Sequence, residues 1–156
     1  MIAIFSILFV VFYYLKDNYI YNMTPSIPIG FYKIEKISNQ NDIKVGDIIV
    51  FNISLSDKAF LIERGYISKR TKALMKKISA KEGDIVEVDN FLKINGKIIK
   101  KLKDKDIMGK NLPLKKGKFQ LKEGEYFLIG DSSNSFDSCY LGIIKDSQFL
   151  FKVKQK

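Results

Sequence analysis

Serine hydroxyls, lysine amines and aspartate carboxylates occur together in three short segments of this sequence. The side chains that could share one reaction are Thr24, Ser26, Lys76, Lys77, Asp131, Ser135 and Asp137. A serine hydroxyl is a poor nucleophile until a neighbouring base takes its proton, and lysine can take it only as the neutral amine. These residue types therefore indicate nucleophilic catalysis by a serine with a lysine base.

The absence of histidine from all 156 residues narrows the possible chemistry. Histidine is the usual general base and the commonest metal ligand, so Ser-His-Asp and Cys-His mechanisms are excluded. Cys139 is the single cysteine, and it can form neither an intramolecular disulfide nor a thiolate zinc cluster. We expect no cofactor and no metal, and a base drawn from Lys, Asp, Glu or the N-terminal amine.

The two adjacent lysines lie in a predicted strand, ALMKKISA, at residues 73–80. Alternate side chains of a strand face opposite ways, so only one of Lys76 and Lys77 can point inward, and the alternation does not decide which. An ordinary lysine pKa of about 10.4 must fall by about two to three units before the neutral amine is common near pH 7 to 8. Burial among apolar side chains can supply that shift.

Thr24 and Ser26 lie two residues apart in a segment that also contains Pro25 and Pro28. The prolines would hold the segment extended, which places both hydroxyls on one side and reduces the entropy lost in positioning them. This arrangement suits a nucleophile with an oxyanion donor beside it. The alternative is an ordinary proline-rich connection without a catalytic role.

The N-terminal run at residues 1–15, MIAIFSILFVVFYYL, is almost entirely apolar. Fifteen helical residues span roughly 22 Å, and a helix continuing through Tyr21 would approach a hydrocarbon core of about 30 Å. A basic start and a small-residue cleavage site are both missing, so we expect an uncleaved single-pass anchor at 1–21. The domain with the candidate serine and lysine, a serine-lysine peptidase domain, would then span 22–156. A buried N-terminal core segment is the alternative, and charge does not fix the orientation.

The net charge of +10 favours acidic partners and anionic lipid headgroups. Lysines are spread through residues 69–122 without the interleaved aromatic residues of a single-strand binding groove. We therefore expect a solvated basic surface, membrane lipid as a partner and no nucleic-acid partner.

Beyond the proline-containing segment, the sequence predicts a mostly β domain. Strands rich in β-branched and aromatic residues are expected at 31–37, 47–53, 73–80, 84–100, 125–131 and 148–154. The segment 84–100 reads as a hairpin with turns at Asp89-Asn90 and Asn95-Gly96. Residues 59–76 could instead hold a short helix, and residues 100–120 are expected to be irregular.

Five segments in this order carry a resemblance to a known family. They are NMTPSIPIGFY (22–32), VGDIIVF (45–51), LMKKISAKEGDIVEV (74–88), FLKINGK (91–97) and GDSSNSFDSCYLG (130–142). They resemble the serine box, Gly-Asp strand box, lysine box, hairpin and last box of the type I signal peptidases, in the conjugative-transfer (TraF-type) branch. In that lysine box the base precedes a Gly-Asp pair by seven residues, which selects Lys76. The resemblance covers nearly the whole chain.

The resemblance implies a signal-peptidase-like β domain behind one transmembrane helix, and it implies roles for individual residues. Ser26 would be the nucleophile and Lys76 the general base, with the Ser26 backbone N–H and the Thr24 hydroxyl forming the oxyanion hole. Ser135 would help to orient Lys76.

The last box carries two further implied roles and the main departure from the family. Asp137 would have a supporting catalytic role, and Asp131 would hold the loop together. Cys139 stands where the family usually has an arginine, so we expect the ion pair to Asp137 to be lost. Lys77 replaces the usual arginine after the base, and Lys81-Glu82 stands where Leu-Pro is common.

The resulting hypothesis is a serine endopeptidase anchored in the cytoplasmic membrane, with its catalytic domain on the outer, periplasmic side. Its substrate would be an exported precursor protein, most specifically the pilin precursor of a conjugative or type IV secretion system. The substrate would bind as an extended strand with shallow pockets for small side chains. A general type I signal peptidase and a non-catalytic, membrane-tethered basic binding module are the alternatives.

Overall fold

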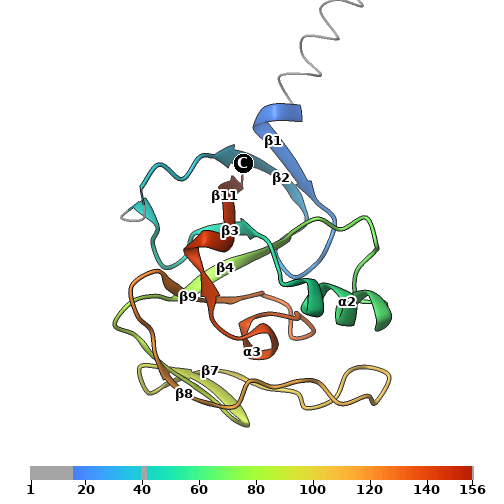
Figure 1. Cartoon of the computed structure of the whole chain (residues 1–156), viewed down its shortest axis with the longest axis vertical. Coiled ribbons are helices and arrows are strands. Elements are labelled where there is room, and N and C mark those ends of the chain that lie inside the picture. The colour runs from blue at the N-terminus through green and yellow to red at the C-terminus, as the bar shows by residue number, and fades with distance from the viewer. Residues whose placement is uncertain (1–15, 40–41, 156) are drawn as a thin grey trace, which may run out of the picture.

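The computed structural model describes residues 16–39 and 42–155, which form two antiparallel β-sheets with short helices at their edges (Figure 1). The mostly β prediction is confirmed. Residues 1–15, which hold most of the expected anchor, lie outside the described residues. Within the part that is described, no helix is both long and apolar enough to cross a membrane.

The larger sheet has seven strands in the order β1-β2-β11-β3-β4-β9-β10. Their bounds are β1 Tyr19–Asn22, β2 Gly30–Glu35, β3 Ile48–Phe51, β4 Leu74–Ala80, β9 Glu125–Ile129, β10 Ile144–Lys145 and β11 Phe149–Gln155. Strand β11 pairs with β2 on one side and with β3 on the other. The β1–β2 hairpin is thus joined to the rest of the sheet through β11.

The smaller sheet has four strands in the order β7-β6-β5-β8. Their bounds are β5 Ile85–Val88, β6 Phe91–Ile94, β7 Lys97–Lys101 and β8 Gly117–Gln120. It lies below the larger sheet in Figure 1. Val86 and Leu92 from this sheet belong to the same buried cluster as Ala80 and Phe127 from the larger one, so the two sheets share a core.

The helices described, α2, α3 and a 3-10 turn, are short, and a side chain caps the start of α2 and of α3. Helix α2 spans Leu55–Glu63, and the Ser54 hydroxyl accepts a hydrogen bond from the Asp57 N–H at its first turn. Helix α3 spans Ser138–Leu141, and the Asp137 carboxylate caps it by accepting from the Cys139 N–H. A 3-10 turn, η2 (Asp146–Gln148), precedes β11.

The predicted strands and turns are present with small shifts at their ends. Asn95 and Gly96 both have positive φ, 49° and 79°, as a two-residue hairpin turn requires. The hairpin predicted at 84–100 becomes β5, β6 and β7, with its turns at the expected positions.

Four expectations differ from the structure. The short helix begins at Leu55 and ends before the predicted 59–76 segment is half complete, because the Ser54 cap starts it earlier. Part of the segment expected to be irregular, Gly117–Gln120, forms β8 against β5. The loop after the last predicted Gly-Asp pair contains α3. Tyr19–Asn22 forms β1, paired with β2, so an anchor helix does not continue through Tyr21.

Candidate active site

Ser26 lies in the connection between β1 and β2, and the side chain of Asn22 holds this connection in shape. The Asn22 amide nitrogen donates to the carbonyl oxygens of Thr24, Ile27 and Pro28 at 2.8, 2.7 and 3.1 Å. The Asn22 carboxamide oxygen accepts from the Thr24 N–H at 3.2 Å. Asn22 is itself buried, so the turn that carries Ser26 is stabilised by hydrogen bonds from an interior side chain. No role was predicted for Asn22.

Two further contacts fix the Ser26 segment against the rest of the domain. The Tyr32 hydroxyl donates to the Pro28 carbonyl oxygen at 2.7 Å. The Asp131 N–H donates to the Ser26 carbonyl oxygen at 2.7 Å. The serine box is therefore bonded directly to the last box, although more than a hundred residues separate them in the sequence.

Lys76 is the inward-pointing lysine of β4, with 4% of its surface exposed. Its Nζ lies 3.0 Å from the Ser26 Oγ, within hydrogen-bond distance. Burial is the main reason that the pKa of Lys76 falls from 10.5 to about 8. The Asp137 carboxylate raises this pKa, and the Lys100 ammonium lowers it further. A substantial fraction of the amine is therefore neutral near pH 8, where it can accept the Ser26 proton.

Lys77 points the other way and does not reach the site. Its Nζ pairs with the Asp131 carboxylate at 2.8 Å, and 37% and 43% of the two side chains are exposed. The alternation of β4 thus separates two adjacent lysines into different environments. Asp131 connects β4 to the last box through this pair, and to Ser26 through its N–H.

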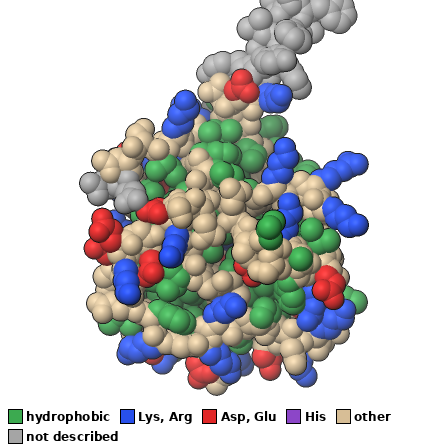
Figure 2. Space-filling view, viewed as in Figure 1, with side chains coloured by type: hydrophobic (Ala, Val, Ile, Leu, Met, Phe, Trp, Pro, Cys, Tyr) green, Lys and Arg blue, Asp and Glu red, His purple; other side chains and the backbone are tan. Residues whose placement is uncertain are grey.

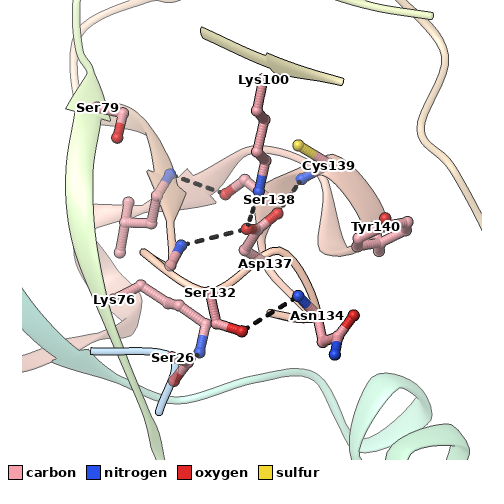
Figure 3. A network of polar contacts seen from close by, with 12 residues as sticks. Ser26, Lys76, Ser79, Lys100, Ser132, Asn134, Asp137, Ser138, Cys139 and Tyr140 are labelled. Carbon is pink, nitrogen blue, oxygen red and sulfur yellow. Dashed lines mark hydrogen bonds and ion pairs between the residues drawn. The ribbon is translucent and has the colours of Figure 1, made fainter. Parts of the chain in front are cut away.

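Asp137 is completely buried and lies at the centre of a polar network (Figure 3). Its carboxylate accepts from the Gly130 N–H at 3.2 Å and from the Cys139 N–H at 3.1 Å. It also accepts from the Lys100 Nζ at 2.7 Å, and 22% of the Lys100 side chain is exposed. Position 139 supplies no cation to Asp137, since it holds a buried cysteine, and Lys100 of β7 supplies one instead, which was not predicted.

The two remaining predicted residues make fewer contacts than expected. The Ser135 Oγ is buried and has no hydrogen-bond partner among the described residues, so it does not bond Lys76 here. The Thr24 hydroxyl donates to the Asn22 side-chain oxygen at 3.1 Å and lies 3.3 Å from the Ser26 Oγ. Thr24 thus lies beside the Ser26 hydroxyl, with its own proton directed to Asn22.

The position of Gly130 requires a residue without a side chain. A Cβ atom there would lie 2.1 Å from the Ser135 Oγ and 2.8 Å from the Ser26 carbonyl oxygen. Because Asp137 and Asp131 both bond backbone groups in this region, Gly130 lets the last box approach the serine box closely. Gly130 was quoted as part of a motif, but this packing role was not predicted.

A cavity of about 440 Å³ opens beside Ser26 and Lys76. Apolar side chains from α2, β4, the loops and α3 line it, including Leu61, Ile67, Leu74, Phe136 and Tyr140. This volume falls within the usual range of ligand pockets. The cavity has room for several side chains of a bound peptide.

Lys103 and Lys105 line this cavity together with Lys76, so part of the basic charge lies beside the site. Lys and Arg side chains are spread over the face shown in Figure 2, with acidic side chains between some of them. No group of three or more Cys, Asp or Glu side chains in the described segments is placed to hold a metal ion.

Comparison with known proteins agrees with this geometry. The profile of the family described as signal peptidase, peptidase S26, matches residues 1–155. The chain therefore belongs to the signal peptidase family, peptidase S26, which consists of serine-type peptidases. It is also similar to a "Conjugal transfer protein TraF" from Agrobacterium tumefaciens (strain 15955), with 29% identity over 145 residues that cover 87% of this chain and 80% of that protein. The resemblance to the TraF-type branch is confirmed.

Proposed function

We propose that this chain is a membrane-anchored serine endopeptidase in which Ser26 and Lys76 form the catalytic dyad. The observation that carries the proposal is the 3.0 Å distance between the Lys76 Nζ and the Ser26 Oγ, at a lysine whose pKa burial lowers to about 8. A nucleophile and a base in hydrogen-bond contact are the minimum for covalent catalysis.

In the proposed reaction, the neutral Lys76 amine takes the Ser26 proton as the Oγ attacks the scissile carbonyl carbon. The oxyanion that forms accepts from the Ser26 backbone N–H, and from the Thr24 hydroxyl once that group turns away from Asn22. The Lys76 ammonium then gives its proton to the leaving amine as the C–N bond breaks, leaving an acyl ester on Ser26. Water attacks this ester while Lys76 takes one water proton, which finally returns to the Ser26 Oγ.

The proposed substrate is an exported precursor protein, and the specific candidate is a pilin precursor of a conjugation system. Membership of the signal peptidase family supports the substrate class, and similarity to a conjugal transfer protein supports the specific candidate. An extended precursor segment would lie in the cavity beside Ser26. The apolar run at residues 1–15 supports a membrane anchor. The proposal places this anchor in the cytoplasmic membrane with the domain on its outer face, because enzyme and exported precursor would then share one surface.

The deciding experiment is labelling of the full chain, in detergent micelles, with a serine-reactive phosphonate probe. We expect one label, mapped to Ser26 by mass spectrometry, and loss of the label in Ser26→Ala and Lys76→Met. Labelling that persists in Ser26→Ala would contradict the dyad. Co-expression with a neighbouring pilin-like gene, followed by mass measurement of its mature product, tests the substrate; an unprocessed product would exclude that substrate.

A further inference from the structure

The strand that supplies Lys100 has an inverted pattern of exposure. In β7, Ile98 and Ile99 are 57% and 41% exposed, whereas Lys100 is the one residue of the strand that is partly buried. A charged side chain directed inward while its apolar neighbours face water requires a compensating contact inside. That contact is Asp137, 2.7 Å away.

Asp137 requires nearby hydrogen-bond donors and a cation, because its side chain has no solvent exposure. A buried carboxylate is stable only when it is paired and hydrogen-bonded. The N–H groups of Gly130 and Cys139 satisfy part of its hydrogen-bonding capacity, and Lys100 supplies the only cation in contact with it among the described residues. Position 139 of α3, where the resembled family carries an arginine, holds a buried cysteine.

We propose that Lys100 is a positioning residue of the peptidase, which neutralises Asp137 from the smaller sheet and so prevents Asp137 from holding Lys76 as an ammonium. This inference rests on the proposed Ser26–Lys76 chemistry. Lys100 does not touch the nucleophile, and it acts on the base through Asp137. Figure 3 shows Lys100 reaching Asp137 from one side, with Lys76 on the other side in this view.

The electrostatics of the site agree with this geometry. Asp137 raises the pKa of Lys76 and Lys100 lowers it, after burial as the main cause. The other titratable groups that Asp137 affects are the Cys139 thiol and the Tyr140 hydroxyl, both of α3. Burial, with Asp137 adding to it, raises the pKa of both groups, that of Tyr140 to about 12, so both are neutral near pH 7. Removing the Lys100 charge therefore leaves Lys76 as the cation that Asp137 stabilises.

The test compares Lys100→Gln with Lys101→Gln in the full chain. Gln at position 100 can still donate a hydrogen bond to Asp137 but carries no charge, and Lys101 is an exposed neighbour in the same strand. The rate of phosphonate labelling at Ser26 is measured from pH 6 to pH 10, and thermal unfolding is measured on each protein.

We expect Lys100→Gln to move the midpoint of the pH–rate profile upward by about one pH unit. Because fewer Lys76 amines are then neutral, labelling at pH 7 should fall about tenfold. Lys101→Gln should keep the wild-type profile, and Lys100→Arg should restore it. The double variant Lys100→Gln with Asp137→Asn should return the midpoint towards the wild-type value.

The outcomes separate this inference from the proposed function. If wild-type protein is labelled at Ser26 and Lys100→Gln lowers only the melting temperature, with an unchanged midpoint, Lys100 is merely structural and the inference is overturned. If wild-type Ser26 is not labelled at all, the proposed function fails first. The Lys76 amine is then titrated directly by NMR in protein with isotope-labelled lysine, and an unchanged titration in Lys100→Gln would overturn the inference independently.

Discussion

The two faces of β4 place two lysines in different environments, one buried and one at the surface. Lys76, on the face that meets Ser26, is buried, and its pKa is lowered to about 8. Lys77, one residue later, pairs with Asp131 at the surface. Residue type therefore says little about reactivity here, because the difference comes from which side of the strand faces apolar side chains and a hydroxyl.

Replacing each lysine in turn gives the most direct test of this difference between the two faces of β4. Lys76→Met should reduce Ser26 labelling by about a thousandfold or more, because the proposed general base is lost. Lys77→Met should retain labelling within about twofold, since its ion pair lies outside the site. Equal losses in the two variants would contradict the assignment of the base to the buried face.

The pH dependence of stability should also differ between the two faces. The folded-state pKa of Lys76, about 8, lies below the unfolded value of 10.5. Between these values the unfolded chain holds a proton that the folded chain has released, so the free energy of unfolding should rise with pH, by about 3 kcal/mol in total. Below pH 8 this penalty on the folded state is fully present.

Lys76→Met is the matched control for this effect, measured by urea unfolding at pH 7 and pH 10. It should remove the rise and should be more stable than wild type at pH 7, because it no longer buries an ammonium. Lys77→Met should keep the rise. A wild-type stability that does not increase between these pH values would contradict the burial of an ionisable amine.

Gly130→Ala tests whether the site needs the close contact of Gly130 with Ser135 and with the Ser26 backbone. The new methyl group would overlap Ser135 and the Ser26 carbonyl oxygen. We expect a loss of about 1–3 kcal/mol in stability and a clear fall in labelling, because Ser26 moves away from Lys76. Adding Ser135→Gly should recover part of both losses, since it removes one of the two clashes. A fully active Gly130→Ala protein would show that the contact is not needed.

The smallest expected effect concerns the exposed face. A double-mutant cycle on Lys77→Met and Asp131→Asn should give a coupling of less than about 1 kcal/mol, decreasing with added salt. A larger, salt-insensitive coupling would mean that this pair behaves like a buried one.

Much of the fold could be predicted because its signals are local. The alternation in residues 73–80 and the Asn95-Gly96 turn depend on neighbouring residues, and the structure has both. The seven-residue spacing selected Lys76 by resemblance, although the alternation alone left Lys76 and Lys77 equal. The start of α2 was misplaced because the Ser54 cap begins the helix upstream of the predicted segment at 59–76.

The missed parts of the site depend on contacts between distant segments. Lys100 and Asp137 are 37 residues apart, and nothing in the sequence distinguishes Lys100 among 27 lysines and arginines. The cysteine at position 139 indicates that another residue must supply the cation for Asp137, but it does not indicate which one. The lack of a partner for Ser135 follows from side-chain packing, which a motif does not specify.

The position of β11 has a consequence for the order of assembly. Strand β11 follows every other described element in sequence, yet it separates the hairpin that carries Ser26 from the strands that carry Lys76. During synthesis, the sheet cannot join the Ser26 hairpin to the strand that carries Lys76 until β11 has left the ribosome. The proposed dyad would therefore stay incomplete until β11 is inserted between β2 and β3.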